Sequence, residues 1–169
     1  HGGYLATENL YLRGCRKIGI LTGSLKSNSP TNERLEGYEK FLTEKQLQSH
    51  VFTIDSRASS MALKTIEIKR ILENEDLDSL FCTDDLTAIL VYNICQEMNI
   101  AIPQDLKLIG YDGTKFVQNY FPQLSTIAQP IADFADLLVD LLIQRITTPE
   151  KKLEQYYALP IKLIQGKTT

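Results

Sequence analysis

Polar side chains stand at points where the sequence predicts buried strands to end. Asp112 closes the apolar run 107–112, and Gln129 follows the β-branched run 125–128. Asp84 comes directly after the short run 79–83, and Arg34 lies in the first turn of a predicted helix. In open α/β folds, ligands bind at the carboxyl ends of the parallel strands. The sequence therefore predicts a cleft whose donors and acceptors suit a polyhydroxyl ligand.

Each of these side chains also has a plainer interpretation. Asp112 stands between Gly-Tyr and Gly-Thr and could simply form a turn. Asp84 suits the cap of the following helix, a role compatible with accepting hydroxyl protons. Arg34 could lie on a solvated surface, or its guanidinium could bridge two hydroxyls or pair with Asp112 or Asp84. A cation is unfavourable at the start of a helix, so we expect some partner to compensate it.

Composition limits the class of protein. The 169 residues fit one domain, or one domain plus part of another, and the 43% hydrophobic and 23% charged fractions are those of an ordinary globular chain. The formal net charge of −3 gives no electrostatic footprint for nucleic acid or for an acidic membrane surface. We find no apolar run long enough to span a membrane and no basic-then-apolar leader.

The residues that usually ligate metals or act as nucleophiles are sparse. Cys15, Cys82 and Cys95 lack C-x-x-C spacing and are predicted to be core thiols of a protein in the reducing cytosol. The histidines, His1 and His50, are too few for a zinc site or a histidine-based triad. The sequence therefore predicts no metal.

Cofactor chemistry is likewise unsupported. The glycine-rich motifs that cradle a dinucleotide or a nucleotide phosphate do not occur in the chain. An enzyme could still use Asp84, Asp85 and Asp112 as acid and base, but no second group of suitable character is predicted beside them. We therefore predict no cofactor and no enzymatic activity.

Alternating strand and helix patterns predict an α/β fold with an open, mostly parallel, doubly wound sheet and helices on both faces. The predicted strands are 17–22, 51–54, 79–83, 107–112 and 125–128, with an edge strand at 155–164 that tolerates a proline. The predicted helices are 3–13, 31–48, 62–72, 84–99 and 131–146. The chain thus opens on a helix whose preceding strand is absent, so it reads as a fragment.

Several short motifs occur in one order along nearly the whole chain. They are G-C-R-K-I at 14–18, R-L-E-G-Y at 34–38, F-C-T-D-D at 81–85, I-P-Q-D-L at 102–106, I-G-Y-D at 109–112, and P-Q-L-S-T-I-A-Q-P at 122–130. With these motifs the chain resembles the effector-binding core of the lac repressor/gal repressor family of bacterial transcription regulators, whose fold is similar to type I periplasmic binding proteins. The loop that follows Asp112, with glycine at position 113, is similar to the corresponding loop of sucrose- and ribose-type repressors of Gram-positive bacteria.

The resemblance implies a binding site and a dimer contact. A sugar or sugar phosphate effector would be held by Arg34, Asp84, Asp112 and Gln129. The family usually carries asparagine at the position of Asp84, so either the ligand differs or Asp84 pairs with Arg34. A homodimer would form through one helix and one loop, with the contact residues Ala88, Val91, Tyr92, Cys95, Phe116, Asn119, Tyr120 and Phe121.

The resemblance also implies a division of the chain. Residues 1–128 would form the C-terminal effector-binding subdomain, 129–156 would cross into an otherwise missing N-terminal subdomain, and 157–169 would return as a strand. The DNA-binding headpiece would be absent, so operator DNA would be bound only through that missing part. The expected function is a cytoplasmic, sugar-responsive repressor without enzymatic activity. A periplasmic sugar-binding transport receptor is the first alternative, and an α/β hydrolase or isomerase is a remote one.

Overall fold

A computed structural model of the chain describes residues 1–23, 29–54, 60–150, 152, 154 and 156–169. Within them, a six-stranded sheet has the order β2-β1-β3-β4-β5-β6. The strands are β1 (Ile18–Thr22), β2 (His50–Thr53), β3 (Ser79–Cys82), β4 (Lys107–Asp112), β5 (Ser125–Ala128) and β6 (Lys162–Ile164). The helices are α1 (Gly2–Leu12), α2 (Pro30–Lys45), α3 (Met61–Asn74), α4 (Asp85–Glu97), α5 (Lys115–Tyr120) and α6 (Ile131–Thr147).

The sheet is mixed but mostly parallel, as predicted. The strands from β1 to β5 pair in parallel, and β6 alone among the described strands runs antiparallel, beside β5. Every residue of β1 and β3 is buried. Such continuous apolar strands are expected where helices cover both faces of a parallel sheet.

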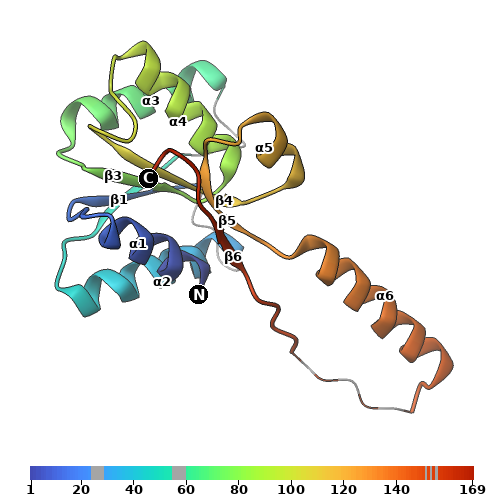
Figure 1. Ribbon diagram of the computed structural model, residues 1–169. Coiled ribbons are helices and arrows are strands. Elements are labelled where there is room, and N and C mark those ends of the chain that lie inside the picture. Colours follow the sequence, from blue (N-terminus) through green and yellow to red (C-terminus); the bar gives the residue numbers. More distant parts are fainter. Residues whose placement is uncertain (24–28, 55–59, 151, 153, 155) are drawn as a thin grey trace.

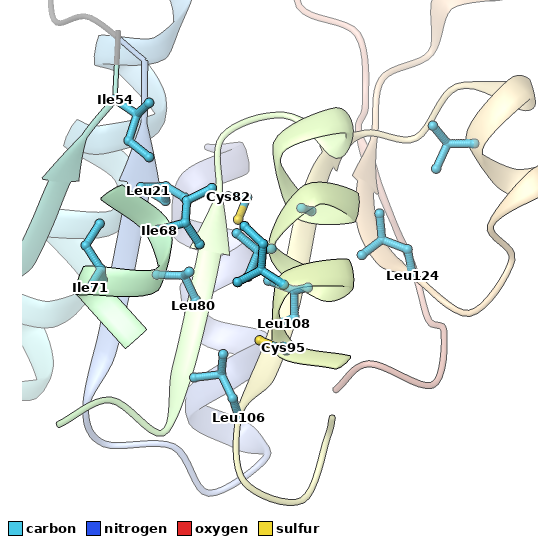
Figure 2. Packing of buried hydrophobic residues seen from close by; sticks show 14 residues of the cluster. Leu21, Ile54, Ile68, Ile71, Leu80, Cys82, Cys95, Leu106, Leu108 and Leu124 are labelled. Carbon is cyan, nitrogen blue, oxygen red and sulfur yellow. The ribbon is translucent and has the colours of Figure 1, made fainter. Parts of the chain in front are cut away.

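The two faces of the sheet carry different helices. Figure 1 shows α1 and α2 on one face and α3 and α4 on the other. On the face covered by α1 and α2, Tyr38 and Phe41 belong to one buried cluster with Phe81 of β3. Figure 2 shows the opposite core, where residues of α3 and α4 meet side chains from β1, β3 and β4, among them Ile68, Leu80 and Leu108. This sandwich confirms the doubly wound fold.

The cysteines belong to this core. Cys15, Cys82 and Cys95 are free and buried, which confirms the prediction of core thiols. Burial raises the pKa of Cys95 to about 11 and the pKa of Cys82 well above its ordinary value. Both thiols therefore stay protonated and unreactive near neutral pH.

The end of the chain differs from the prediction of a long edge strand. The edge strand predicted over 155–164 pairs only at Lys162–Ile164, and residue 155 lies outside the described residues. Residues 156–161 form no strand, and Pro160 among them has no N–H to donate. Beyond β6, Thr168 is buried and bonded to both Leu108 and Ser125, which anchors the chain end on β4 and β5.

Two further features concern helices. The segment 115–120, predicted as part of a loop, is the short helix α5, because the Thr114 hydroxyl accepts a hydrogen bond from the Val117 N–H and caps it.

Helix α6 projects away from the sheet (Figure 1) and has no buried residue. Among the described helices, none is long and apolar enough to cross a membrane.

Candidate functional site

The candidate site lies where the winding of the sheet reverses. From β1 the chain moves outward to β2, and it then returns to the other side of β1 to form β3, β4 and β5. Ligands of open α/β sheets bind at the carboxyl ends of the strands next to this reversal. Arg34 follows β1, Asp84 follows β3, and Asp112 ends β4. The topology therefore brings the predicted side chains to one edge of the sheet.

Arg34 is the fifth residue of α2, just past the first turn, and Ser29 caps this helix by accepting the Thr31 N–H at 3.3 Å. Its guanidinium donates to the main-chain oxygen of Thr83 and to Asp112 Oδ1, the latter with an N···O distance of 3.4 Å. The guanidinium carbon also lies 3.8 Å from the centre of the Tyr111 ring. These contacts supply the compensation expected for a cation at a helix start.

Asp112 is the centre of the hydrogen-bonded group. Besides Arg34, its Oδ1 accepts from Gln129 Nε2 at 2.7 Å, and its main-chain oxygen accepts the Gln129 N–H at 3.0 Å. Burial raises the pKa of Asp112, and the nearby positive charge of Arg34 opposes that rise. Three of the four predicted site residues therefore form one network: Arg34, Asp112 and Gln129.

Asp84 does not pair with Arg34, which corrects one of the two sequence-based alternatives. Asp84 caps α4 instead: its Oδ1 accepts the Thr87 N–H and its Oδ2 accepts the Thr87 hydroxyl, both at 2.8 Å. A carboxylate has about four acceptor sites, so these bonds leave Asp84 able to accept from a ligand hydroxyl. The capping interpretation and the binding interpretation are thus compatible.

Two residues at the carboxyl edge of the sheet contribute to the candidate site without having been predicted from the sequence to do so. Tyr111 supplies the ring beneath Arg34, and no pattern distinguished it from an ordinary core tyrosine. From the sequence, Asp85 is a candidate only for acid or base chemistry. Its side chain is buried and accepts hydrogen bonds from Gly113 and Thr126, and burial raises its pKa to about 6. The glycine at 110, which leaves room for this carboxylate, was the available signal.

A cavity of about 620 Å³ opens between the start of α6 and the returning segment 156–161. Small-molecule sites usually measure about 300–1,000 Å³. Of the predicted site residues, Gln129 lines the cavity, and it connects to Asp112 through the hydrogen bond described above. The aromatic side chains around the cavity are Tyr111, Phe134, Tyr156 and Tyr157. Among the described residues, no group of three or more His, Cys, Asp or Glu side chains could hold a metal ion.

The predicted dimer residues fall into two groups. Ala88, Val91 and Cys95 are completely buried in the core of the chain itself, so they offer no surface to a second chain. Their helical spacing marks the face of α4 that packs on the sheet. The remaining residues lie on or next to α5: Phe116 and Tyr120 are exposed with ring centres 4.8 Å apart, Asn119 is exposed, and Tyr92 contacts Phe121 edge to face.

The fold and the polar edge define an α/β domain whose hydrogen-bonding side chains gather at the carboxyl ends of its parallel strands. Residues 7–169 match the family described as periplasmic binding protein-like domain, and the chain belongs to that family. It is 45% identical over 167 residues to a sucrose operon repressor of Pediococcus pentosaceus, covering 99% of this chain and 51% of that protein. The chain spans about half the length of the curated relatives it matches.

Solved structures agree with this membership. A lac repressor dimer bound to operator and the anti-inducer ONPF is 28% identical, with a TM-score of 0.85 over 99% of this chain and 57% of that one. A periplasmic binding protein/LacI transcriptional regulator of Alkaliphilus metalliredigens, in complex with D-xylulofuranose, is 29% identical with a TM-score of 0.83, over 99% of this chain and 62% of that one. The resemblance to the lac repressor/gal repressor family is confirmed.

Proposed function

We propose that this chain is the effector-binding and dimerisation portion of a sugar-responsive transcriptional repressor. The observation that carries the proposal is the network of Arg34, Asp112 and Gln129 at the carboxyl edge of the sheet, beside a cavity of suitable volume. The similarity to a sucrose operon repressor and to a regulator in complex with a sugar supports it. The relatives named above lend no support to a transport receptor, a hydrolase or an isomerase.

The proposed effector is a small sugar or sugar phosphate. Arg34 and Gln129 would donate to its oxygens, and Asp84 and Asp112 would accept from its hydroxyls. The ligand would be bound and released unchanged, because the proposed role of these groups is recognition rather than catalysis. We propose that the protein acts in the cytoplasm.

The proposed division of the chain follows the course of α6. Residues 1–128 would form one lobe of the binding core, 129–156 would cross into a second lobe, and 157–169 would return. The exposed apolar side of α6 supports a second lobe, which would be supplied by sequence outside this chain. Effector bound between the lobes would favour one state of closure and pass it to a DNA-binding part, also outside this chain.

The binding proposal is tested with the complete gene product and a panel of sugars led by sucrose and its phosphate esters. Arg34→Ala and Asp112→Ala should each weaken binding ten- to hundredfold in calorimetry, because losing a charged hydrogen-bond partner costs about 1.5–3 kcal/mol. Arg16→Ala is the matched control, since Arg16 lies 4.0 Å from the Tyr11 ring outside the site. Unchanged affinity in both site variants would refute the assignment.

The proposed homodimer contact uses the surface of α5 and the adjoining residues Tyr92 and Phe121. Aromatic side chains are enriched at such interfaces, and Phe116 and Tyr120 are 63% and 76% exposed. Tyr120→Asp should shift the protein to monomers at concentrations of about 10 µM in analytical ultracentrifugation, because it places a charge in the contact. Leu12→Asp, which changes an equally exposed residue of α1, should leave the dimer intact.

A further inference from the structure

We propose that Asp85 is a positioning residue for effector binding: its buried carboxylate fixes the turn after β4 and thereby the direction of the Asp112 carboxylate. This inference rests on the proposed function, in which Asp112 contacts the effector. Asp85 itself is 2% exposed and lies below the edge of the sheet, so it would not touch the ligand. Its effect on binding would pass through Asp112.

The carboxylate of Asp85 joins three elements. Asp85 is the first residue of α4. Its Oδ2 accepts the Gly113 N–H at 2.7 Å, in the turn after β4, and its Oδ1 accepts the Thr126 hydroxyl at 2.6 Å, on β5. Hydrogen bonds to an ionised acceptor are shorter and stronger than neutral ones. One side chain thus ties the start of α4 to the turn after β4 and to the second residue of β5.

The turn that Asp85 holds has an unusual backbone. Asp112 has a φ of +116°, a value that residues with a side chain rarely adopt. Such a conformation persists only where the surroundings determine it. The bond from the Gly113 N–H to Asp85 fixes the peptide that follows Asp112, and the Gln129 N–H fixes the Asp112 oxygen at 3.0 Å. Without Asp85, one of these two restraints would be lost.

Gly110 shows that space is reserved for this carboxylate. A Cβ at position 110 would lie 2.4 Å from Asp85 Oδ1, far closer than two such atoms can approach. Gly110 is not among the described glycines with positive φ, so its backbone does not require glycine. A side chain is excluded there chiefly by Asp85. Gly110→Ala would therefore displace the carboxylate without changing any residue proposed to contact the effector.

Protonation of Asp85 provides a way to test the role. Burial is the largest cause of its raised pKa, and the negative charges of Asp112 and Asp84 add to it. The neutral thiol of Cys82 also lies nearby, and Arg34 is occupied by Asp112 and the Thr83 oxygen. A protonated Asp85 keeps one acceptor oxygen but accepts the Gly113 N–H more weakly, so the affinity for effector should fall by no more than about threefold as pH drops from about 7.5 to about 5.

The experiment measures sucrose binding by calorimetry across this pH range in the complete gene product. Asp85→Ala and Gly110→Ala should weaken binding about tenfold at neutral pH. Asp85→Asn should retain affinity within about threefold, because its amide oxygen can accept from Gly113 and the Thr126 hydroxyl can rotate to accept from its NH₂. The Asn variant should also lose the dependence on pH that Asp85 confers. If it keeps the wild-type pH profile, the titrating group is Asp112 and the inference is overturned.

Asp78→Ala is the matched control for a general loss of stability. Asp78 is also a carboxylate that accepts main-chain N–H groups, those of Arg16 and Lys17, but at the opposite edge of the sheet. The Asp78→Ala variant should have a lower free energy of unfolding and an unchanged affinity for sucrose. Equal losses of affinity in Asp78→Ala and Asp85→Ala would reduce Asp85 to a structural role and overturn the inference.

Hydrogen exchange of the Gly113 amide, measured without sugar, separates the two proposals. Its protection should fall in Asp85→Ala and Gly110→Ala but not in Asp78→Ala. If the wild-type protein binds no sugar while Gly113 loses protection as expected, the proposed function fails and the role of Asp85 in holding the turn stands. If Gly113 keeps full protection in both variants, the turn does not depend on Asp85, and the inference fails whatever the protein binds.

Discussion

Helices α4 and α6 begin in the same way and end in different surroundings. Each follows a parallel strand closely, and each carries an apolar stripe. Helix α4 lies on the sheet and buries Asp85, Ala88, Val91, Ile94 and Cys95. Helix α6 leaves the sheet (Figure 1) and buries nothing. Its exposed apolar residues are Ile131, Phe134, Leu138, Val139, Leu142, Ile143 and Ile146.

The difference shows that an apolar stripe requires a partner but does not identify it. For α4 the partner is the sheet, which lies within reach of the same short connection. For α6 the described residues provide none. Because a helix of this length gains most of its stability from packing, α6 should be far less stable than the sheet and its flanking helices. Substitutions of the same type should therefore change the free energy of unfolding more in the sheet and its flanking helices than in α6.

The largest expected difference is in hydrogen exchange of the monomeric 169-residue chain. Amides of β4 should exchange only on global unfolding, which costs about 5–15 kcal/mol in typical domains. Amides of 134–142 in α6 should exchange at least about 100-fold faster, since they open locally. Equal protection of the β4 amides and the α6 amides in the monomer would contradict the prediction that α6 is less stable than the sheet. Protection of α6 that rises with chain concentration would identify a second copy as its partner.

A matched pair of phenylalanine substitutions comes next. Phe81→Ala, at a completely buried position of β3, should lower the free energy of unfolding by about 3–5 kcal/mol, since it removes a large core side chain. Phe134→Ala changes a side chain of α6 that is 52% exposed, so its effect should stay within about 0.5 kcal/mol. Urea unfolding followed by circular dichroism measures both. Similar losses would mean that α6 is packed in solution.

Two aspartate-to-asparagine substitutions, one in α4 and one in α6, extend the comparison to the pH dependence of stability. Burial raises the pKa of Asp85 from 3.8 to about 6, so the folded state binds this proton more tightly than the unfolded state. The free energy of unfolding should therefore fall as pH rises from about 4 to about 6. Asp85→Asn removes that titration, so the variant should be about 1–3 kcal/mol more stable than the wild type at pH 7 and equal to it near pH 4.

The matching change in α6 is Asp140→Asn, at an exposed position. Because this side chain is exposed, the substitution should change the free energy of unfolding by no more than about 0.5 kcal/mol. Asp112 titrates in the wild type and in Asp85→Asn, so the difference between them also contains the change in its interaction with Asp85. An Asp85→Asn variant that is less stable than the wild type at pH 7 would show that the hydrogen bonds to the ionised Asp85 outweigh its burial.

The smallest expected effect concerns a pair of threonines. The hydroxyl of Thr168 accepts the Ser125 N–H at 2.9 Å and donates to the Leu108 oxygen at 2.7 Å, in a buried position. Thr168→Val should lower the free energy of unfolding by about 1–2 kcal/mol, because it leaves a buried donor and a buried acceptor unpaired. Thr148→Val, at the exposed end of α6, should change the free energy of unfolding by at most about 0.5 kcal/mol in the same urea titration.

Much of the site followed from the places where strands end. Asp112 and Gln129 were predicted at neighbouring strand ends, and parallel pairing of β4 with β5 brings them into hydrogen-bond contact. Arg34 was expected to need a partner, and the fold supplies Asp112. The sequence left Asp84 as a second possible partner, because both acids follow strands. Only the geometry of the α4 cap, where Thr87 engages both oxygens of Asp84, decided between them.

Local propensity and the periodicity of apolar residues were enough to predict the alternating strands and helices, the buried character of β4 and the presence of a polar edge. The tertiary structure alone decided which side of α4 is core, that Asp85 reaches across to Gly113 and Thr126, and that α6 has no cover among the described residues. Those outcomes depend on contacts between residues distant in sequence, and no pattern within one segment specifies the segment that will lie against it.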